Sequence, residues 1–290
     1  MSAWVLGVLG GSGVYELDGL ENRQWRRVET PWGEPSDELL FGELGGIRLV
    51  FLPRHGRGHR LSPTEVNARA NIDALKRAGC TDVLSLSAVG SLREDLSPGT
   101  FVLVDQYIDR TYAREKSFFG QGVIAHVSMA RPTCPRLSAL AAEAAREARA
   151  RVVEGGTYLA MEGPQFSTRA ESELYRAWGC DVIGMTNMPE AKLAREAELP
   201  YASVGMVTDY DCWRDDTDAV EVGQVIQTLM ANAAKGRSLV ALLAQRLGAI
   251  ARGPSPIDTV LDQSVLTPRD AVTPEAGRRL AAVAGRWLRG

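Results

Sequence analysis

Two aspartates separated by one tyrosine follow an apolar segment in "MVTDYDCW", residues 206–213. Residues 202–207 are apolar except for one serine and one glycine, a pattern typical of a buried strand. A carboxylate at the end of such a strand costs free energy unless something binds it. Burial and a nearby like charge both raise a carboxyl pKa, so Asp209 and Asp211 together are candidates for a functional site. The structural alternative for Asp209 is a helix cap.

A dense set of anion donors follows another apolar run, in "FLPRHGRGHR" (51–60). Arginine offers paired N–H donors to phosphate oxygens, so the segment predicts an anion site. The alternatives are a metal site at two of its histidines and a basic surface loop. "RHG" is also similar to the phosphate pocket of histidine phosphatases, but that family needs a later histidine and none follows His126. The donors are Arg54, His55, Arg57, His59 and Arg60.

Two further runs end in glycines and small residues. "LGGSGVY" (9–15) offers backbone N–H groups and the Ser12 hydroxyl to an anion. It does not match a dinucleotide-binding loop, because Glu16 occupies the third glycine position of that motif. "SLSAVGSL" (85–92) ends in small residues that let a ligand approach the backbone. The alternative for residues 9–15 is a turn that binds no ligand, and the alternative for residues 85–92 is ordinary close packing.

Two more segments place polar or aromatic residues after a run. "MEGPQFSTRAES" (161–172) holds Glu162, Phe166 and Ser167, and the phenyl ring is able either to stack on a planar ligand or to plug the core. "GMTNMPEA" (184–191) ends a run in Thr186 and Asn187. Taken together, these strand ends suit a ligand that has a phosphate part and a planar polar part.

The elements that must position these residues follow from apolar patterning. Helical patterns alternate with the apolar runs, and one of them has Ser62, Pro63 and Glu65 as its predicted N-terminal cap and Gly79 as its end. The alternation predicts a single α/β domain with a mixed, largely parallel central β-sheet flanked by helices. The predicted strands are 4–9, 47–52, 82–90, 100–105, 155–161, 180–185 and 201–207, and the predicted helices are 62–79, 136–150, 168–179, 188–199, 219–247 and 274–289.

Composition narrows the class of protein. The chain has 290 residues, 45% hydrophobic and 24% charged, enough for a substantial core. A net charge of −3 and a pI of about 5.8 do not favour nucleic acid as a partner. The four cysteines form neither CxxC nor a zinc spacing, and we expect free thiols. With no signal peptide or membrane span in the sequence, we expect a soluble cytoplasmic protein.

The C-terminal part of the chain has its own pattern. "ARGPSPIDT" (251–259) resembles a linker, so we divide the chain into residues 1–250 and an extension, 251–290, packed on the same domain. The extension's terminal helix is predicted to pack against the protein rather than a membrane surface. Its apolar face comprises Leu280, Val283, Ala284, Trp287 and Leu288.

In order and spacing, these motifs resemble the 5′-methylthioadenosine phosphorylases of the purine nucleoside phosphorylase superfamily. The resemblance covers about residues 5–245 and rests on "GVLGGSGVY", "FLPRHGRGH", "VNARANIDALKRAG", "SAVGSLRE", "DQYIDRT", "EGPQFSTRAES", "GMTNMPEA" and "YASVGMVTDYDCW". It implies a nucleoside phosphorylase-like fold for the catalytic domain, residues 1–250. It also implies a reaction in which inorganic phosphate attacks the anomeric carbon of a nucleoside while the purine leaves, with no metal or organic cofactor.

The resemblance implies a role for each motif. Met185 lies under the ribose, Phe166 and Ser167 border the base, and Val222 and Val225 line the pocket for the 5′ substituent. His126 reaches in from a neighbouring subunit, which implies a homo-oligomer, typically a homotrimer. The implied phosphate ligands are Ser12, Arg54, His55, Ser87, Ala88 and Thr186.

The resemblance also assigns the two aspartates. A protonated Asp209 donates to purine N7 as the general acid, and Asp211 holds the base-side hydrogen bonds. Relatives that act on 6-oxopurines carry asparagine at the first position, so "TDYD" indicates a 6-aminopurine. Other apolar 5′ groups, a broader purine nucleoside phosphorylase, a nucleosidase that uses water and a non-catalytic purine-binding protein remain as alternatives.

Overall fold

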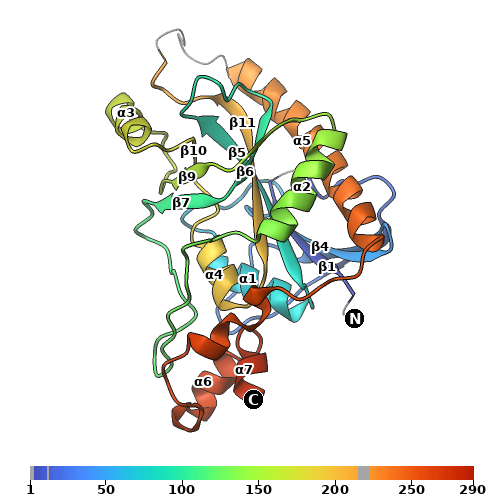
Figure 1. Cartoon of the computed structure of the whole chain (residues 1–290), viewed down its shortest axis with the longest axis vertical. Coiled ribbons are helices and arrows are strands. Elements are labelled where there is room, and N and C mark those ends of the chain that lie inside the picture. The colour runs from blue at the N-terminus through green and yellow to red at the C-terminus, as the bar shows by residue number, and fades with distance from the viewer. Residues whose placement is uncertain (1–2, 12, 215–221) are drawn as a thin grey trace.

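The structure is a computed structural model that describes residues 3–11, 13–214 and 222–290, with the backbone alone over 222–226. Its centre is an eleven-stranded mixed sheet with helices on both faces (Figure 1). The strands are β1 (Val5–Gly10), β2 (Glu21–Arg26), β3 (Leu39–Leu44), β4 (Ile47–Pro53), β5 (Asp82–Ser91), β6 (Thr100–Val104), β7 (Gln106–Asp109), β8 (Arg151–Glu154), β9 (Thr157–Ala160), β10 (Val182–Gly184) and β11 (Tyr201–Tyr210).

Parallel pairing in the middle of the sheet brings the predicted site segments to one edge. The strand order is β2-β3-β4-β1-β5-β10-β9-β7, with β11 pairing to β5 and β6, and β6 to β8. Strands β4, β1, β5 and β11 run parallel to one another. Their carboxyl ends therefore point the same way, and in open α/β sheets this is the edge at which ligands bind.

All seven predicted strands are confirmed, whereas β2, β3, β7 and β8 escaped sequence analysis. The sequence of β2, ENRQWR, is almost wholly exposed and lacks an apolar run. Strands β7 and β8 have four residues each and are mostly half-buried or exposed. Sequence patterning detects strands through burial, so short strands near the sheet margins leave little signal.

Helices cover both faces of the sheet, and all the predicted ones except the terminal helix are confirmed with shifts at their ends, residues 219–221 of the predicted helix 219–247 lying outside the described residues. The part of the chain with described side chains holds no helix long and apolar enough to cross a membrane. The helices are α1 (Ala68–Arg77), α2 (Pro135–Glu147), α3 (Arg169–Ala177), α4 (Glu190–Glu196), α5 (Val222–Gly248), α6 (Pro274–Arg279) and α7 (Gly285–Arg289), with 3-10 segments η1 (Pro256–Gln263) and η2 (Arg269–Ala271).

The predicted start of the first helix was wrong by one and a half turns. Ser62 and Glu65 do bond to each other, as a capping box would, but they close a separate turn. Helix α1 begins six residues later than Ser62, at Ala68, because the Asn67 side chain accepts from the Ala70 N–H. Gly79 follows the helix with φ +83° and ends it as predicted.

The predicted terminal helix is also corrected, because residues 274–289 form two short helices, α6 and α7. The apolar face is nevertheless inside, with Leu280, Val283, Ala284 and Trp287 buried. At Ala284 the backbone departs from helical geometry (φ −116°, ψ 14°), which separates the two helices while this face stays packed. Tertiary burial of the face has overridden the continuous helix that its spacing predicts.

Charged contacts join residues 251–290 to the rest of the chain. Arg252 bonds to the fully buried Asp82 and also to Asp258. Arg286 donates to both carboxylate oxygens of Glu198, just after α4, at 2.8 and 2.6 Å. The extension thus packs beside α4, at the lower end of the molecule in Figure 1. The division of the chain at residue 250 stays a prediction.

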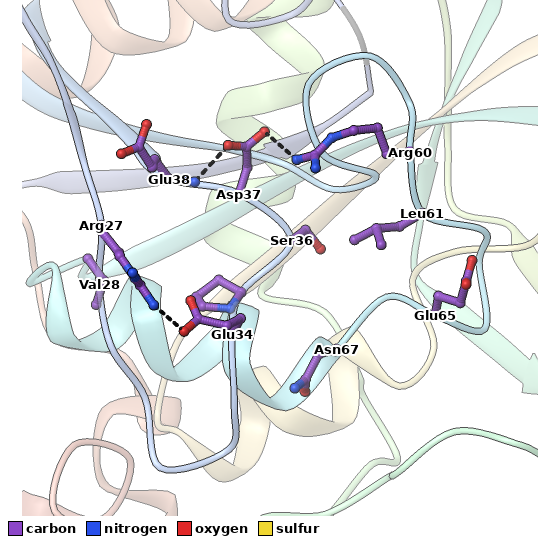
Figure 2. A pocket seen from close by; sticks show the side chains of 11 residues that line it. Arg27, Val28, Glu34, Ser36, Asp37, Glu38, Arg60, Leu61, Glu65 and Asn67 are labelled. Carbon is purple, nitrogen blue, oxygen red and sulfur yellow. Dashed lines mark hydrogen bonds and ion pairs between the residues drawn. The ribbon is translucent and has the colours of Figure 1, made fainter.

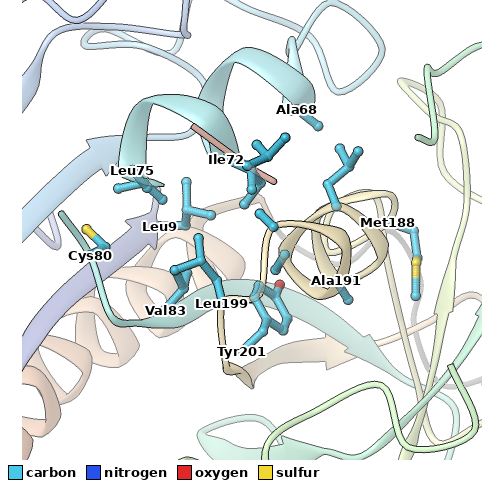
Figure 3. Close-up of a cluster of buried hydrophobic side chains, with 14 of the residues drawn as sticks. Leu9, Ala68, Ile72, Leu75, Cys80, Val83, Met188, Ala191, Leu199 and Tyr201 are labelled. Carbon is cyan, nitrogen blue, oxygen red and sulfur yellow. The ribbon is translucent and has the colours of Figure 1, made fainter. Parts of the chain in front are cut away.

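Two large hydrophobic clusters hold α1, α4, α2 and α5 against the sheet, and a smaller third one contains Tyr175 of α3. Side chains of β1 pack on both faces of the sheet. Leu9 belongs to the cluster under α1 and α4, and Leu6 belongs to the cluster under α2 and α5. Figure 3 shows Ile72 of α1, Ala191 of α4 and Tyr201 of β11 meeting in the first cluster. Full burial of one such leucine or isoleucine contributes about 1.5–3 kcal/mol. This packing fixes α4 beside the sheet and hence the loop before it.

A long connection between β7 and α2, residues 110–134, is named the arm. It contains no helix and only isolated bridges, and it runs down to the C-terminal helices (Figure 1). Two residues of α4 hold it. Arg195 donates to the carbonyls of Ser128 and Arg131, and the Glu196 carboxylate accepts from the Ser117 hydroxyl and the Phe118 N–H, both at 2.7 Å.

We predict that Glu196 makes the stability of the protein fall as the pH rises. Burial raises the pKa of Glu196 to about 7, whereas an unfolded glutamate titrates near 4.3. The folded state therefore holds the extra proton between these values, and the associated stability is full below pH 4.3 and lost by about pH 7. Between pH 5 and 8, Glu196→Gln should gain on the order of 2 kcal/mol relative to the wild type.

Urea unfolding of both proteins at pH 5, 6, 7 and 8 measures this difference. Glu143→Gln, a change of an exposed carboxylate on α2, is the control and should follow the wild type throughout. Parallel curves for Glu196→Gln and the wild type would contradict the prediction.

Candidate active site

The parallel pairing of β5 with β11 places the small residues of β5 beside the aspartates of β11. Ser87 pairs with Gly205, and Gly90 pairs with Asp209 after a bulge at 207–209. A Cβ on Gly90 would lie 3.3 Å from Asp209 Oδ1, so the strand end is closely packed there. Ala88 is exposed although its β5 neighbours are buried, which leaves the backbone open at this point.

Arg54 is the buried cation at the centre of this edge. Its guanidinium forms a bidentate pair with Glu190 of α4, and both side chains are under 5% exposed. It also donates to the Leu86 carbonyl and the Ser85 hydroxyl of β5, at 3.0 and 2.6 Å. These contacts use four of its five N–H hydrogens, leaving one on Nη1 without a partner among the described residues. Burial opposes the charge, but Glu190 raises the pKa of Arg54 overall.

His55 presents a hydrogen-bond acceptor to the same pocket. Burial, and then the charge of Arg54, lower the pKa of His55 to about 4, so the ring is neutral near pH 7. Its Nδ1 lies 2.8 Å from the Leu61 carbonyl, which can only accept, so Nδ1 carries the hydrogen and Nε2 a free lone pair. Arg54 and His55 line one small pocket together with Met185 and Thr186.

The other two arginines of this loop pair outside the pocket, whereas His59 stays beside His55. Asp37 pairs with Arg57 at 2.7 Å and with Arg60 at 3.7 Å. Figure 2 shows Asp37 and Arg60 at a separate cavity of about 420 Å³, which Leu61 also lines. His59 stacks on His55 with ring centroids 4.4 Å apart. No group of three or more potential metal-ligating side chains occurs in the part of the chain that the structure describes.

Thr186 and Ser87 supply hydroxyls beside the pocket that holds Arg54. Thr186 follows β10, and its Oγ1 donates to the Asn187 side chain at 3.1 Å. Ser87 Oγ is buried and has no hydrogen-bond partner among the described residues. A buried hydroxyl without a partner is uncommon in a folded protein, and the Ser87 hydroxyl is therefore available to a bound anion.

Asp209 and Asp211 form the second half of the site. Asp209 accepts the Thr208 hydroxyl at 2.6 Å, and the pKa of Asp209 is raised by burial and by the charge of Asp211, the two causes expected from the sequence. Burial also raises the pKa of Asp211. Asp211 Oδ2 completes no hydrogen bond among the described residues, although the Ser172 hydroxyl is near enough to lower that pKa slightly.

The loop after β9 faces these aspartates. The Ser167 carbonyl accepts from the Cys212 thiol at 3.2 Å, which ties this loop to the residue after Asp211. Ser167 itself is buried, whereas the Phe166 side chain is 84% exposed and free to pack on a bound molecule. The alternative for Phe166, a ring that plugs the core, is therefore wrong.

Three predicted site residues cannot be placed. Ser12 lies outside the described residues, and the side chains of Val222 and Val225 do as well. His126 is in the arm, where its backbone N–H donates to the Ser264 carbonyl at 2.8 Å. Within one chain, the described contacts of His126 are thus with the C-terminal extension rather than with the pocket residues.

The structure adds a pair, Arg114 and Glu162, to which the sequence analysis assigned no role. Both side chains are under 8% exposed and bond at 3.0 Å. Arg114 also donates to the carbonyls of Met185 and Met188, both at 2.8 Å. Glu162 also accepts from the Thr64 hydroxyl and from backbone N–H groups of the arm, which lower its pKa to about 2 although burial opposes this.

This pair therefore joins four loops around the pocket. Glu162 stands in a quoted motif, "EGPQFSTRAES", and nothing in its spacing shows that the partner is 48 residues away.

Comparisons with known proteins agree with this geometry. The family model described as "Phosphorylase superfamily" matches residues 5–244. The chain is 61% identical over 287 residues to a protein named S-methyl-5′-thioadenosine phosphorylase from Cereibacter sphaeroides, covering 99% of both chains. A protein of the same name from Rhodospirillum rubrum is 58% identical, with 98% of this chain and 97% of the relative covered.

Solved structures show the same likeness. A methylthioadenosine phosphorylase from an antarctic soil metagenomic library superposes with a TM-score of 0.92 at 47% identity, covering 98% of this chain and 99% of the other. A mutant adenosine/methylthioadenosine phosphorylase from Schistosoma mansoni, in complex with adenine, gives 0.81 at 39% identity, over 86% and 93% of the two chains.

We predict that Arg114→Lys destabilises the protein by roughly 2–4 kcal/mol, because an ammonium keeps the charge but cannot reach the same set of carbonyls. Chemical unfolding of both proteins measures the change. Arg246→Lys is the matched control, since Arg246 pairs with Glu143 and Glu147 at the surface, where a lysine should cost less than about 0.5 kcal/mol. Equal losses in the two variants would show that the buried geometry of Arg114 contributes nothing.

Proposed function

The chain belongs to the phosphorylase superfamily, among its S-methyl-5′-thioadenosine phosphorylases, and we propose that it cleaves S-methyl-5′-thioadenosine with inorganic phosphate. The products are adenine and 5-methylthioribose 1-phosphate, which makes the protein a pentosyltransferase of purine and methionine salvage. One observation carries the proposal. A buried arginine–histidine pocket and two buried aspartates with raised pKa values lie along the same sheet edge.

The phosphate half of the proposal uses Ser12, Arg54, His55, Ser87, Ala88 and Thr186. The remaining Nη1 hydrogen of Arg54 and the unpartnered Ser87 hydroxyl suit an anion. His55 Nε2 suits the P–OH group of monohydrogen phosphate, because a neutral ring with Nδ1–H can only accept there. A phosphate oxygen then forms a bond to C1′ as the C1′–N9 bond breaks. The phosphate anion stabilises the oxocarbenium character of the transition state.

The base half uses the two aspartates. Asp209, whose pKa is raised by burial and by the charge of Asp211, donates a proton to N7 as the electron pair of the broken bond enters the purine. The proton that the adenine gains is balanced by the proton that monohydrogen phosphate gives up. Asp211 holds the base-side hydrogen bonds through its unpartnered Oδ2. A 6-amino group donates to a carboxylate, whereas a 6-oxo group would be repelled, so adenine is preferred.

The remaining substrate contacts follow the resemblance. Met185 lies under the ribose, Phe166 and Ser167 border the base, and Val222 and Val225 give the 5′ group an apolar wall. The exposure of Phe166 and the link from Ser167 to Cys212 support the base side. The Schistosoma mansoni relative is named an adenosine/methylthioadenosine phosphorylase, which favours adenosine or another 5′-modified adenosine as a second candidate substrate.

We further propose a homotrimer in which His126 reaches the site of a neighbouring subunit. Support comes from the arm, which carries this histidine away from its own pocket residues to the C-terminal extension. Ile124 of the arm and Leu266 of the C-terminal extension, which are joined by a backbone hydrogen bond, are 52% and 64% exposed and offer apolar surface for a second copy.

The cofactor and the cellular location are also proposals. Phosphate is itself the nucleophile and the counter-charge, so the proposed mechanism needs no metal or organic cofactor. The four cysteines are free thiols, three of them buried, which fits the reducing cytoplasm.

The first test is adenine release from S-methyl-5′-thioadenosine by the purified protein, with and without phosphate, beside inosine. We expect release that requires phosphate and little turnover of inosine. Release that ignores phosphate would indicate a nucleosidase, and comparable turnover of inosine a broader phosphorylase. Tight binding of adenine without turnover would indicate a binding protein.

Replacement of the general acid gives the second test. Asp209→Asn should lower kcat for S-methyl-5′-thioadenosine by about 10²-fold or more, because the amide cannot deliver a proton to N7. Inosine turnover should fall less or rise. Near wild-type kcat in this variant would remove Asp209 from its assigned role.

Subunit sharing gives the third test. Asp209→Asn and His126→Ala are unfolded together, refolded as a mixture and assayed. If a site combines both residues from different subunits, random trimers contain about a quarter intact sites and activity rises above that of either variant alone. If both residues act within one chain, the mixture shows only the average of the two variants.

A further inference from the structure

Tyr158 of β9 contacts Thr186, one of the residues that line the pocket. Its side chain is fully buried, and its hydroxyl lies at the end of β10. The Thr186 N–H donates to Tyr158 Oη at 3.3 Å, and Thr186 Oγ1 lies 3.2 Å from the same oxygen. Since Oη already accepts from the backbone, its own hydrogen is available to the threonine hydroxyl.

We propose that Tyr158 is a positioning residue for phosphate, acting through the Thr186 hydroxyl. This inference rests on the proposed function, because Thr186 is a proposed phosphate ligand. A hydroxyl that accepts from Tyr158 has its own hydrogen directed elsewhere. In the structure that hydrogen goes to Asn187 Oδ1 at 3.1 Å. When phosphate is bound, the hydrogen of the Thr186 hydroxyl turns to the anion. Asn187 Oδ1 then keeps the hydrogen bond from the Ser85 hydroxyl, at 3.4 Å.

The backbone at Gly184 leaves room for this phenol. A Cβ on Gly184 would stand 2.1 Å from Tyr158 Oη and 2.9 Å from the ring carbon that bears it. Any side chain at this position would displace the phenol, so Tyr158 can occupy its place only while residue 184 is glycine.

Two further observations tie the phenol to phosphate binding. Burial raises the pKa of Tyr158, so the group stays a neutral donor across the working pH range. The Ser87 hydroxyl is close enough to lower that pKa in part, yet it completes no hydrogen bond among the described residues. Tyr158 Oη is therefore hydrogen-bonded to one proposed phosphate ligand, Thr186, and near a second, Ser87.

The experiment compares Tyr158→Phe with Tyr107→Phe. Tyr107 is the neighbouring phenol, 5.7 Å away between ring centroids, and its hydroxyl bonds to the Asn187 amide rather than to a proposed ligand. Phosphate KM is measured by adenine release, and phosphate binding by the rise in Tm that it causes. We expect Tyr158→Phe to raise phosphate KM about fivefold to tenfold, with the nucleoside KM within about twofold. Tyr107→Phe should leave both within about twofold.

A double-mutant cycle tests whether Tyr158 acts through Thr186. Thr186→Val removes the hydroxyl while keeping the shape, and Tyr158→Phe added to it should change phosphate KM by less than about twofold. Gly184→Ala provides a second route should Tyr158→Phe fold poorly, because it displaces the phenol and should raise phosphate KM in the same direction.

Each outcome decides the proposal. An unchanged phosphate KM and Tm response in Tyr158→Phe would overturn it. It would also be overturned if phosphate KM of the double variant rose by the product of the two single-variant effects, because Tyr158 would then act independently of Thr186. Equal rises in phosphate KM for the two tyrosine variants would also overturn it, because the effect would then be general loosening. If the wild type itself releases adenine without phosphate, the proposed function fails first and this inference falls with it.

Discussion

The buried ion pair between Arg54 and Glu190 is the interaction on which the rest of the site depends. Both side chains are almost fully buried, and neither charge would be tolerated there alone. The pair holds the end of β4 against the start of α4, and the Ser85 and Leu86 contacts attach both to β5. The loop before α4, which carries Met185 and Thr186, is thereby held beside the strand ends.

Helix α4 extends this constraint to distant parts of the chain. Glu190 serves the pocket, Arg195 and Glu196 hold the arm, and Glu198, just beyond, holds the C-terminal extension through Arg286. One helix of seven residues therefore connects the proposed phosphate site with the segments that the proposed trimer would present to a neighbour. Each of these buried charged side chains has a hydrogen-bond or ion-pair partner in another part of the chain.

Sequence patterning located most of the fold, and its errors have physical causes. The strands buried on both faces are continuous apolar runs, so all seven were found. The exposed strand β2 has no such run. The capping box at Ser62 formed as a turn because Asn67 offered a second cap close by. The terminal helix broke because burial of Leu280 and Trp287 is satisfied by two short helices as well as by one.

By itself the sequence determined the family, because the aspartates, Arg54 and His55 stand in short segments whose residue types and order resemble it. Only the tertiary structure decided how those groups are held and charged. Glu190 is 136 residues from Arg54, and Tyr158 is 28 from Thr186. The raised pKa of Asp209 and the neutral ring of His55 arise from burial, which depends on surroundings that the fold assembles. Local patterns cannot encode such contacts, because the partner, the distance and the loss of water are set by packing.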